Sequence, residues 1–156
     1  MNNITKLVIS IAIPVAIGAT AGFFTVPGVE SWYQTIQKPS WNPPSWVFGP
    51  VWTTLYIMMG IALFLVWKSG ANDSLKRTAI GFFAVQLVLN FFWSFIFFDQ
   101  QQTGWALAEI IVMWFAILVT IFAFAKVSKT AAWLLVPYIS WVSFATVLNY
   151  SIWRLN

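Results

Sequence analysis

The stretch KPSWNPPSWVFGPVWTTLYIMMGIALFLVWK, residues 38 to 68, places a segment rich in proline and tryptophan directly before a long apolar run. Its first fifteen residues hold four prolines and three tryptophans. Proline lacks a backbone N–H and disfavours helix in the residue before it, so Pro39, Pro43 and Pro44 keep this segment extended until about Ser45. We therefore predict a stiff loop that leads into a helix with a fixed start.

The start of this helix carries two further expectations. Asn42 is a candidate N-cap, because its side-chain oxygen can accept a hydrogen bond from a free backbone N–H of the first turn. Pro50 follows one turn later, where its ring conflicts with the carbonyl group of Trp46. We expect a kink there that opens space beneath the loop.

The composition is that of a membrane protein. Hydrophobic residues make up 60% of the chain, charged residues make up 8%, and the mean hydropathy is +0.80, whereas a soluble domain carries about 25% charged residues. Five runs reach the length of about 20 apolar residues that crosses a bilayer as a helix, and they lack the alternation of a β-barrel wall. They lie at about 5–26, 44–67, 78–98, 103–125 and 131–153.

The sequence thus predicts an all-α integral membrane protein, a bundle of five transmembrane helices in a single domain over residues 1–156, with a lid loop at about 27–43. The net charge of +4 comes from basic residues that stand singly or in twos near helix ends. This distribution indicates topology rather than nucleic-acid binding. Most of them fall on the N-terminal side, with Lys38 and Arg154 on the other. The positive-inside rule then predicts a cytoplasmic N-terminus, with the lid loop and the C-terminus outside.

The first run resembles a secretory signal, because Lys6 and an apolar stretch precede the small residues Ala19-Thr20-Ala21. Cleavage there would leave four spans. Gly18 and Gly22, however, form a GxxxG pair that is typical of a helix packed closely on a neighbour. We expect the helix to be retained.

Polar and aromatic residues recur at helical spacing within three of the runs, which indicates their inward faces. The stripes are Trp52, Tyr56 and Met59; Gln86, Asn90, Trp93 and Ser94; and Tyr138, Trp141, Ala145 and Asn149. The amides either hydrogen-bond between helices or orient a ligand. Ala145 is either a close-packing position or the floor of a cavity.

An aromatic cavity with a few amides suits a large, flat, mostly apolar molecule such as a porphyrin or a sterol. Cysteine and histidine are absent, which removes the usual zinc ligands and the common axial haem ligand, so we expect no metal site. Glu109 is the carboxylate that lies within a span, where it either reaches toward the interface or pairs with Arg154. One carboxylate does not make a proton relay, and no familiar catalytic constellation is present.

Three long motifs are similar to those of the translocator protein or peripheral-type benzodiazepine receptor family, known in bacteria as tryptophan-rich sensory proteins. They are WYQTIQKPSWNPPSWVFGPVWTTLY (32–56), QLVLNFFWSFIFF (86–98) and VPYISWVSFATVLNYSIWR (136–154). The resemblance implies a five-helix bundle, usually a homodimer, with a ligand cavity that opens under the first loop. Its implied pocket residues are Tyr33, Trp41, Trp52, Asn90, Trp93, Trp141 and Ala145, to which the stripes add Tyr56 and Asn149.

The resemblance also implies a function, namely binding of protoporphyrin IX or a related tetrapyrrole as a ligand, without a covalently bound cofactor, in a bacterial cell membrane. Two alternatives stay open: light-dependent porphyrin degradation that uses Trp52 and Trp141, and transport of a porphyrin or sterol. Leu148, Tyr150 and Arg154 fit a short sterol-recognition pattern, which is degenerate and of hypothesis grade.

Overall fold

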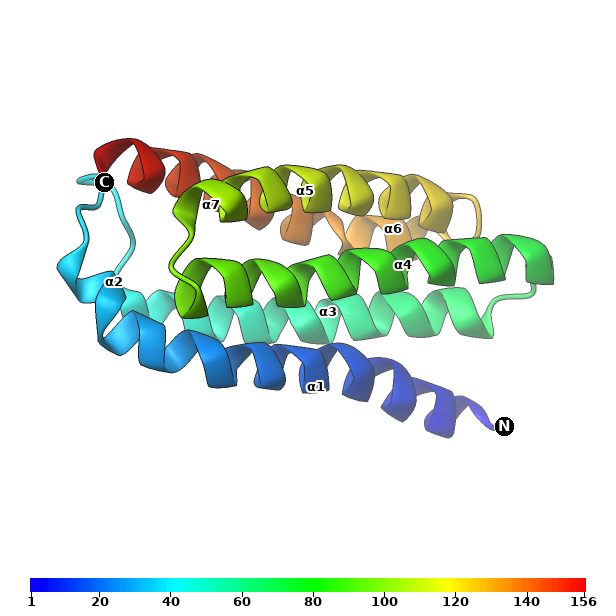
Figure 1. The fold of residues 1–156 in the computed structure, drawn as a ribbon. Coiled ribbons are helices and arrows are strands. Elements are labelled where there is room, and N and C mark those ends of the chain that lie inside the picture. Colours follow the sequence, from blue (N-terminus) through cyan, green and yellow to red (C-terminus); the bar gives the residue numbers. More distant parts are fainter.

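The computed structural model describes residues 1–156 as a bundle of helices (Figure 1). Five helical segments are long and apolar enough to cross a membrane, which confirms the predicted fold class. The elements are α1 (Asn3–Glu30), α2 (Trp32–Thr35), η1 (Ser45–Val47), α3 (Phe48–Lys68), α4 (Asp73–Ser94), η2 (Phe95–Asp99), α5 (Thr103–Ala125), α6 (Lys129–Leu134) and α7 (Val136–Leu155). The N-terminus lies at one end of the bundle, and the C-terminus lies at the other end beside the lid.

Two helices extend beyond the apolar runs. α1 continues through Pro27 to Glu30, because the backbone N–H and the hydroxyl of Ser31 both donate to the Pro27 carbonyl, at 3.1 and 2.6 Å. With α2 following directly, the non-helical part of the lid is shorter than the predicted loop. α4 begins at Asp73, where the Asn72 side chain caps the first turn by accepting from the N–H of Ser74 at 2.7 Å.

The helix start after the prolines differs from both expectations. Asn42 does not cap it; its amide instead accepts from the Tyr33 hydroxyl and donates to the Pro43 carbonyl. The chain forms the short 3₁₀ turn η1 before α3 begins at Phe48. Pro50 is consequently in the first turn of α3, where its missing N–H costs no intrahelical hydrogen bond.

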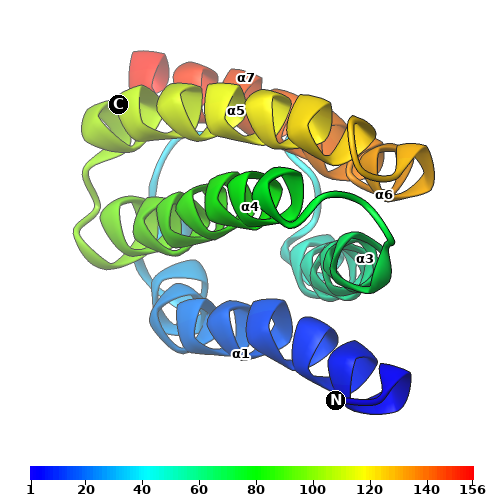
Figure 2. The same ribbon diagram turned by 90° about the vertical axis from the view of Figure 1, so that its right-hand side faces the viewer.

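α1 packs closely on α3 near the N-terminus and then leaves it (Figure 2). At the close crossing, a Cβ on Gly60 would lie 2.5 Å from the Cα of Ile11. Near its other end α1 meets η2, where a Cβ on Gly28 would lie 2.7 Å from the Phe98 carbonyl oxygen. The two helices therefore splay apart toward the lid, and the space between them belongs to a cavity.

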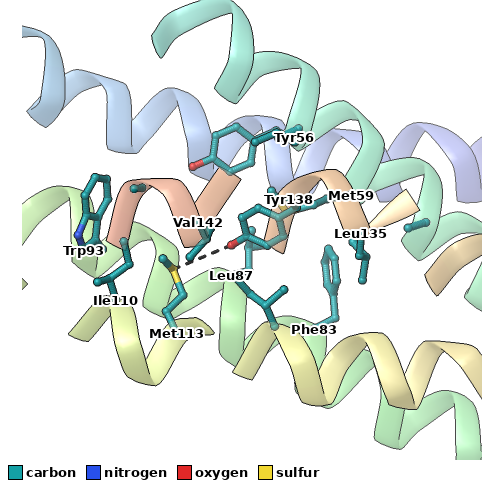
Figure 3. Packing of buried hydrophobic residues seen from close by; sticks show 14 of the residues in the cluster. Tyr56, Met59, Phe83, Leu87, Trp93, Ile110, Met113, Leu135, Tyr138 and Val142 are labelled. Atoms are coloured by element: carbon teal, nitrogen blue, oxygen red, sulfur yellow. Dashed lines mark hydrogen bonds between the residues drawn. The ribbon is translucent and has the colours of Figure 1, made fainter. Parts of the chain in front are cut away.

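A buried chain of hydrogen bonds ties α3, α4 and α7 together in the core. The Tyr56 hydroxyl donates to Asn90 Oδ1, and Asn90 Nδ2 donates to the Tyr138 hydroxyl at 2.9 Å. Tyr138 in turn donates to Gln86 Oε1 at 2.8 Å. Figure 3 shows the Tyr138 hydroxyl directed at Met113 of α5 as well, at 4.0 Å from its sulfur. Gln86 and Asn90 thus make the interhelical hydrogen bonds that were one of the two alternatives for these amides.

Candidate functional site

A cavity of about 580 Å³ occupies the half of the bundle nearest the lid. Its walls come from α1, α3, the end of α4 with η2, and α7, while α2 and η1 close it toward the lid. The volume falls in the range of small-molecule sites. Ten aromatic side chains line it: Tyr33, Trp46, Phe48, Trp52, Tyr56, Trp93, Phe97, Phe98, Trp141 and Phe144.

Most of the predicted pocket residues meet at this cavity. Those that line it are Tyr33, Trp52, Tyr56, Trp93, Trp141, Ala145 and Asn149. Trp41 and Asn90 do not. The Trp41 ring packs at 5.8 Å from that of Phe144 and is 46% exposed, so it covers a wall residue from outside. Asn90 lies behind the wall, where it accepts from Tyr56.

Trp52 projects from α3 into a cluster of aromatic rings. Tyr56, one turn along the same helix, stacks on it with centroids 5.7 Å apart and planes at 29°. The ring centroids of Trp93 in α4 and of Tyr138 in α7 lie 6.4 and 6.3 Å from that of Trp52. Both tyrosine hydroxyls hydrogen-bond to Asn90. The ring of Trp52 therefore packs against side chains whose positions are fixed.

Trp141 carries a hydrogen-bond donor without a partner in the cavity wall. Its indole Nε1 is buried and has no partner in the protein, which is costly for a polar group unless a ligand or water satisfies it. The ring is flanked by Phe144 at 5.3 Å and Phe48 at 6.2 Å. Ala145, one turn further, is a small residue on the cavity surface, as the cavity-floor interpretation proposed.

The side wall is braced by a second set of polar contacts. Trp93 Nε1 donates to Asn149 Oδ1 at 3.1 Å, and Asn149 Nδ2 donates to the carbonyl of Thr103 at 2.8 Å. Asn149 therefore joins α7 to α4 and α5 while it also lines the cavity. Both of the roles left open for this amide are compatible with its position.

The lid is fastened by several hydrogen bonds. The Tyr33 hydroxyl donates to Asn42 Oδ1 at 2.7 Å, and Lys38 Nζ donates to the carbonyls of Tyr33 and Ile36 at 2.6 and 3.0 Å. The Asn156 side chain also pairs with the backbone of Gln37 on both sides. It accepts from the N–H and donates to the carbonyl, each at 2.9 Å. The lid is thus tied both to itself and to the end of α7.

Two acidic residues occupy different settings. Glu30, at the lid end of α1, is the one charged residue among those that line the cavity. Glu109 lies outside it, with both carboxylate oxygens buried and without a partner. The pairing with Arg154, one of the two alternatives for Glu109, is not formed; the single salt bridge joins Lys76 to Asp73 at 2.8 Å.

The sterol-pattern residues do not share a face. Leu148 is buried and lines the cavity, whereas Tyr150 and Arg154 are exposed on α7. A sterol in contact with all three residues would have to span the inside and the outside of one helix.

Sequence reasoning missed the wall that α1 provides. Gly18, Gly22, Thr25 and Val26 line the cavity, although the GxxxG pattern predicts helix packing for the two glycines. Gly18 does pack, against the Tyr56 ring, but a Cβ on Gly22 would meet nothing within 4 Å. An isolated GxxxG pair does not reveal that one glycine faces empty space.

The amino-acid sequence is similar to a known family and to several named proteins. A sequence profile described as the TspO/MBR family matches residues 10–154. The chain is 45% identical over 154 residues to the tryptophan-rich protein TspO of Chlorobaculum tepidum, which covers 99% of this chain and 98% of that protein.

Relatives from other organisms carry other names. The translocator protein of Homo sapiens is 47% identical over 126 residues, which cover 80% of this chain and 75% of that protein. The tryptophan-rich sensory protein of Cereibacter sphaeroides is 38% identical over 138 residues, which cover 88% and 84% of the two chains. Because the profile spans nearly its whole length and the relatives match most of it, the chain belongs to the TspO/MBR family.

Proposed function

We propose that this protein is a membrane receptor that binds a tetrapyrrole such as protoporphyrin IX in the cavity beneath the lid. The observation that carries the proposal is an aromatic cavity of about 580 Å³ whose wall holds the unpaired indole N–H of Trp141. A porphyrin ring offers flat π surface to the aromatic side chains, which prefer offset or edge-on contact with such surfaces.

The lack of basic residues in the cavity supports one orientation of such a ligand. No lysine or arginine lines the cavity, and Glu30 is at its lid end. The carboxylate side chains of protoporphyrin would thus find no counter-charge inside, and burying them unpaired is costly. The proposed pose places the ring against Trp52 and Trp141, with the carboxylates directed to the aqueous end of the bundle.

The names of the relatives include the words sensory and translocator, and both fit a protein that binds a ligand without a familiar catalytic group. We propose a sensing or buffering role in a bacterial cell membrane, with the N-terminus cytoplasmic, the lid outside and two copies forming a homodimer. Chemical cross-linking in native membranes tests the dimer, and protease protection of the lid tests the orientation.

Absorbance titration of protoporphyrin into purified protein, in darkness, tests the binding function. Saturable binding at micromolar concentration, with a shift of the porphyrin bands, is expected. A titration indistinguishable from that of protein-free detergent micelles would reject the proposal. Parallel titration with a sterol decides whether the cavity also accepts that class.

A second candidate is light-dependent porphyrin breakdown, which is favoured by Trp52 and Trp141 lining the same cavity. Illumination of the complex in air would then convert the porphyrin bands into new ones. Replacement of both tryptophans by phenylalanine should leave dark binding measurable and stop this conversion. Equal bleaching by the double variant would remove any role of the two indoles.

A further inference from the structure

We infer that ligands reach the cavity sideways from the bilayer, through a slot between α1 and α3, rather than from water through the lid. This slot is the gap bounded by Val15, Ala19 and Val26 on α1 and by Gly49 and Thr53 on α3. The inference rests on the proposed function for the nature of its ligand. The slot itself follows from the geometry.

Exposure shows where the cavity opens. The cavity-lining residues that are also exposed all come from the first two spans and the short turns beside the lid: the slot residues, together with Glu30, Gln34 and Trp46. Every lining residue from α4, η2 and α7 is buried or half-buried. The cavity therefore has closed walls on those helices and an open side between α1 and α3, which continues to the lid end at Glu30, Gln34 and Trp46.

The helix packing explains this opening. α1 touches α3 at Gly60 and again where Gly18 meets the Tyr56 ring, and it then turns to η2 at Gly28. From Gly18 toward the lid, α1 diverges from α3 (Figure 2). Gly22 and Gly49 lie at this stretch, and a Cβ on either would meet nothing within 4 Å.

The two routes differ in the contacts that must break. Movement of the lid away from the bundle would separate Tyr33 from Asn42 and Gln37 from Asn156, which are joined by hydrogen bonds of 2.7 to 2.9 Å. The slot is not bridged by any side-chain hydrogen bond between α1 and α3. The hydroxyl of Thr53 bonds within its own helix, to the carbonyl of Gly49 at 2.9 Å. The slot is the route with fewer bonds to break.

The rim chemistry indicates which molecules use this route. Val15, Ala19, Val26 and Gly49 present no polar side chain, and they belong to spans apolar enough to lie in the bilayer. Charged or strongly hydrated molecules do not partition to that depth. The slot thus suits flat apolar or weakly amphiphilic ligands that are already dissolved in lipid, which includes porphyrins that lie in the membrane.

Thr53 and Thr54 provide a matched pair of test positions. Both are exposed on α3, and each hydroxyl bonds to the carbonyl four residues earlier at 2.9 Å. Thr53 lines the cavity and Thr54 does not. Thr53→Trp should plug the slot, and Thr54→Trp should leave it open. Ala19→Trp plugs the slot from the α1 side, so that a folding defect in one variant does not decide the outcome.

The experiment uses a small phenyl diazirine dissolved in the bilayer of proteoliposomes, activated by light, with labelled residues mapped by mass spectrometry. We expect label on the α7 wall, at Ala145 and Leu148, in the wild type and in Thr54→Trp. Thr53→Trp and Ala19→Trp should each reduce it about tenfold, because a side chain packed to interior density leaves no passage. Asn156→Ala, which loosens the lid, should not increase it.

Two results would overturn the slot. One is α7 label that persists in both plugged variants and rises in Asn156→Ala, which would assign access to the lid. The other is an unlabelled α7 wall in the wild type, as expected if a second copy covers the gap. The probe is not a porphyrin, so a cavity that labels through the slot yet fails to bind protoporphyrin rejects the proposed ligand and keeps the slot.

Discussion

The backbone of Gly18 in α1 lies against the ring of Tyr56 in α3, so closely that a Cβ on the glycine would overlap the ring. On its other side the tyrosine stacks on Trp52, and its hydroxyl donates to Asn90. The missing side chain of Gly18 therefore fixes the position of a ring that supports the cavity wall. A residue four places along, Gly22, has open space instead.

Gly18→Ala should destabilise the protein. The new methyl group must displace Tyr56, which is buried and hydrogen-bonded, and overpacking of this kind costs about 1–3 kcal/mol. Thermal unfolding in detergent measures the loss. Gly22→Ala is the control on the same helix and should be neutral or slightly stabilising. An unchanged melting temperature in Gly18→Ala would show that Tyr56 moves freely.

Tyr138→Phe should also destabilise the protein, by removing the hydroxyl that accepts from Asn90 and donates to Gln86. Both amides would lose a buried partner, at a cost of about 1–3 kcal/mol. The midpoint of thermal unfolding is the measurement. Tyr150→Phe, at an exposed tyrosine, should leave the midpoint where it is. Equal midpoints for the two variants would contradict the hydrogen-bond chain.

Glu109→Leu should raise stability. The carboxylate oxygens are buried without a partner, and a buried polar group left unpaired costs about 1–3 kcal/mol, which an apolar side chain avoids. The measurement is the midpoint of thermal unfolding of the wild type and of Glu109→Leu. Glu30→Leu, at an exposed acid, is the comparison. A lower midpoint for Glu109→Leu would mean that the carboxylate has a partner in the membrane, such as a bound lipid.

Asn156→Ala should free the lid locally without unfolding the bundle. Its side chain makes hydrogen bonds to both backbone groups of Gln37, and a typical bond contributes about 1 kcal/mol, so exchange of the Gln37 amide should accelerate about fivefold. Hydrogen–deuterium exchange of the lid peptide reports this change. Asn156→Asp keeps the acceptor oxygen, so the exchange rate of the Gln37 amide in this variant should lie between those of the wild type and Asn156→Ala. No acceleration in either variant would show that other contacts hold the lid.

The membrane-spanning bundle could be read from the sequence, because the length of an apolar run depends on bilayer thickness alone. The inward stripes were equally readable: Gln86, Asn90 and Asn149 are all buried, as polar residues at membrane depth require. Helix ends were harder to place. The polar first turn of α4, from Asp73 to Arg77, leaves no hydropathy signal, and hydrogen bonds from Ser31 carry α1 past Pro27.

The shape of the cavity could not be predicted, because it depends on how helices cross. The spacing of Trp52, Tyr56, Trp93 and Trp141 indicated an aromatic cavity, but not that Asn90 lies behind its wall. Trp41 looked like a lid residue over the cavity, and only the fold places it outside, against Phe144. The divergence of α1 from α3, which opens the cavity sideways, arises from contacts between residues far apart in sequence.

The central claim is that the cavity under the lid is the ligand site, and Gly22→Leu tests it most directly. Gly22 lines the cavity and faces open space, so leucine should fill the site without strain. Gly81→Leu is the control, at an exposed glycine of α4 away from the cavity that also has open space.

Protoporphyrin is titrated in darkness into wild type, Gly22→Leu and Gly81→Leu, with equal melting temperatures as the check on folding. The account predicts that Gly22→Leu weakens binding at least tenfold, about 1.4 kcal/mol, while Gly81→Leu binds as the wild type does. Equal affinity of all three proteins would place the porphyrin elsewhere and contradict the account.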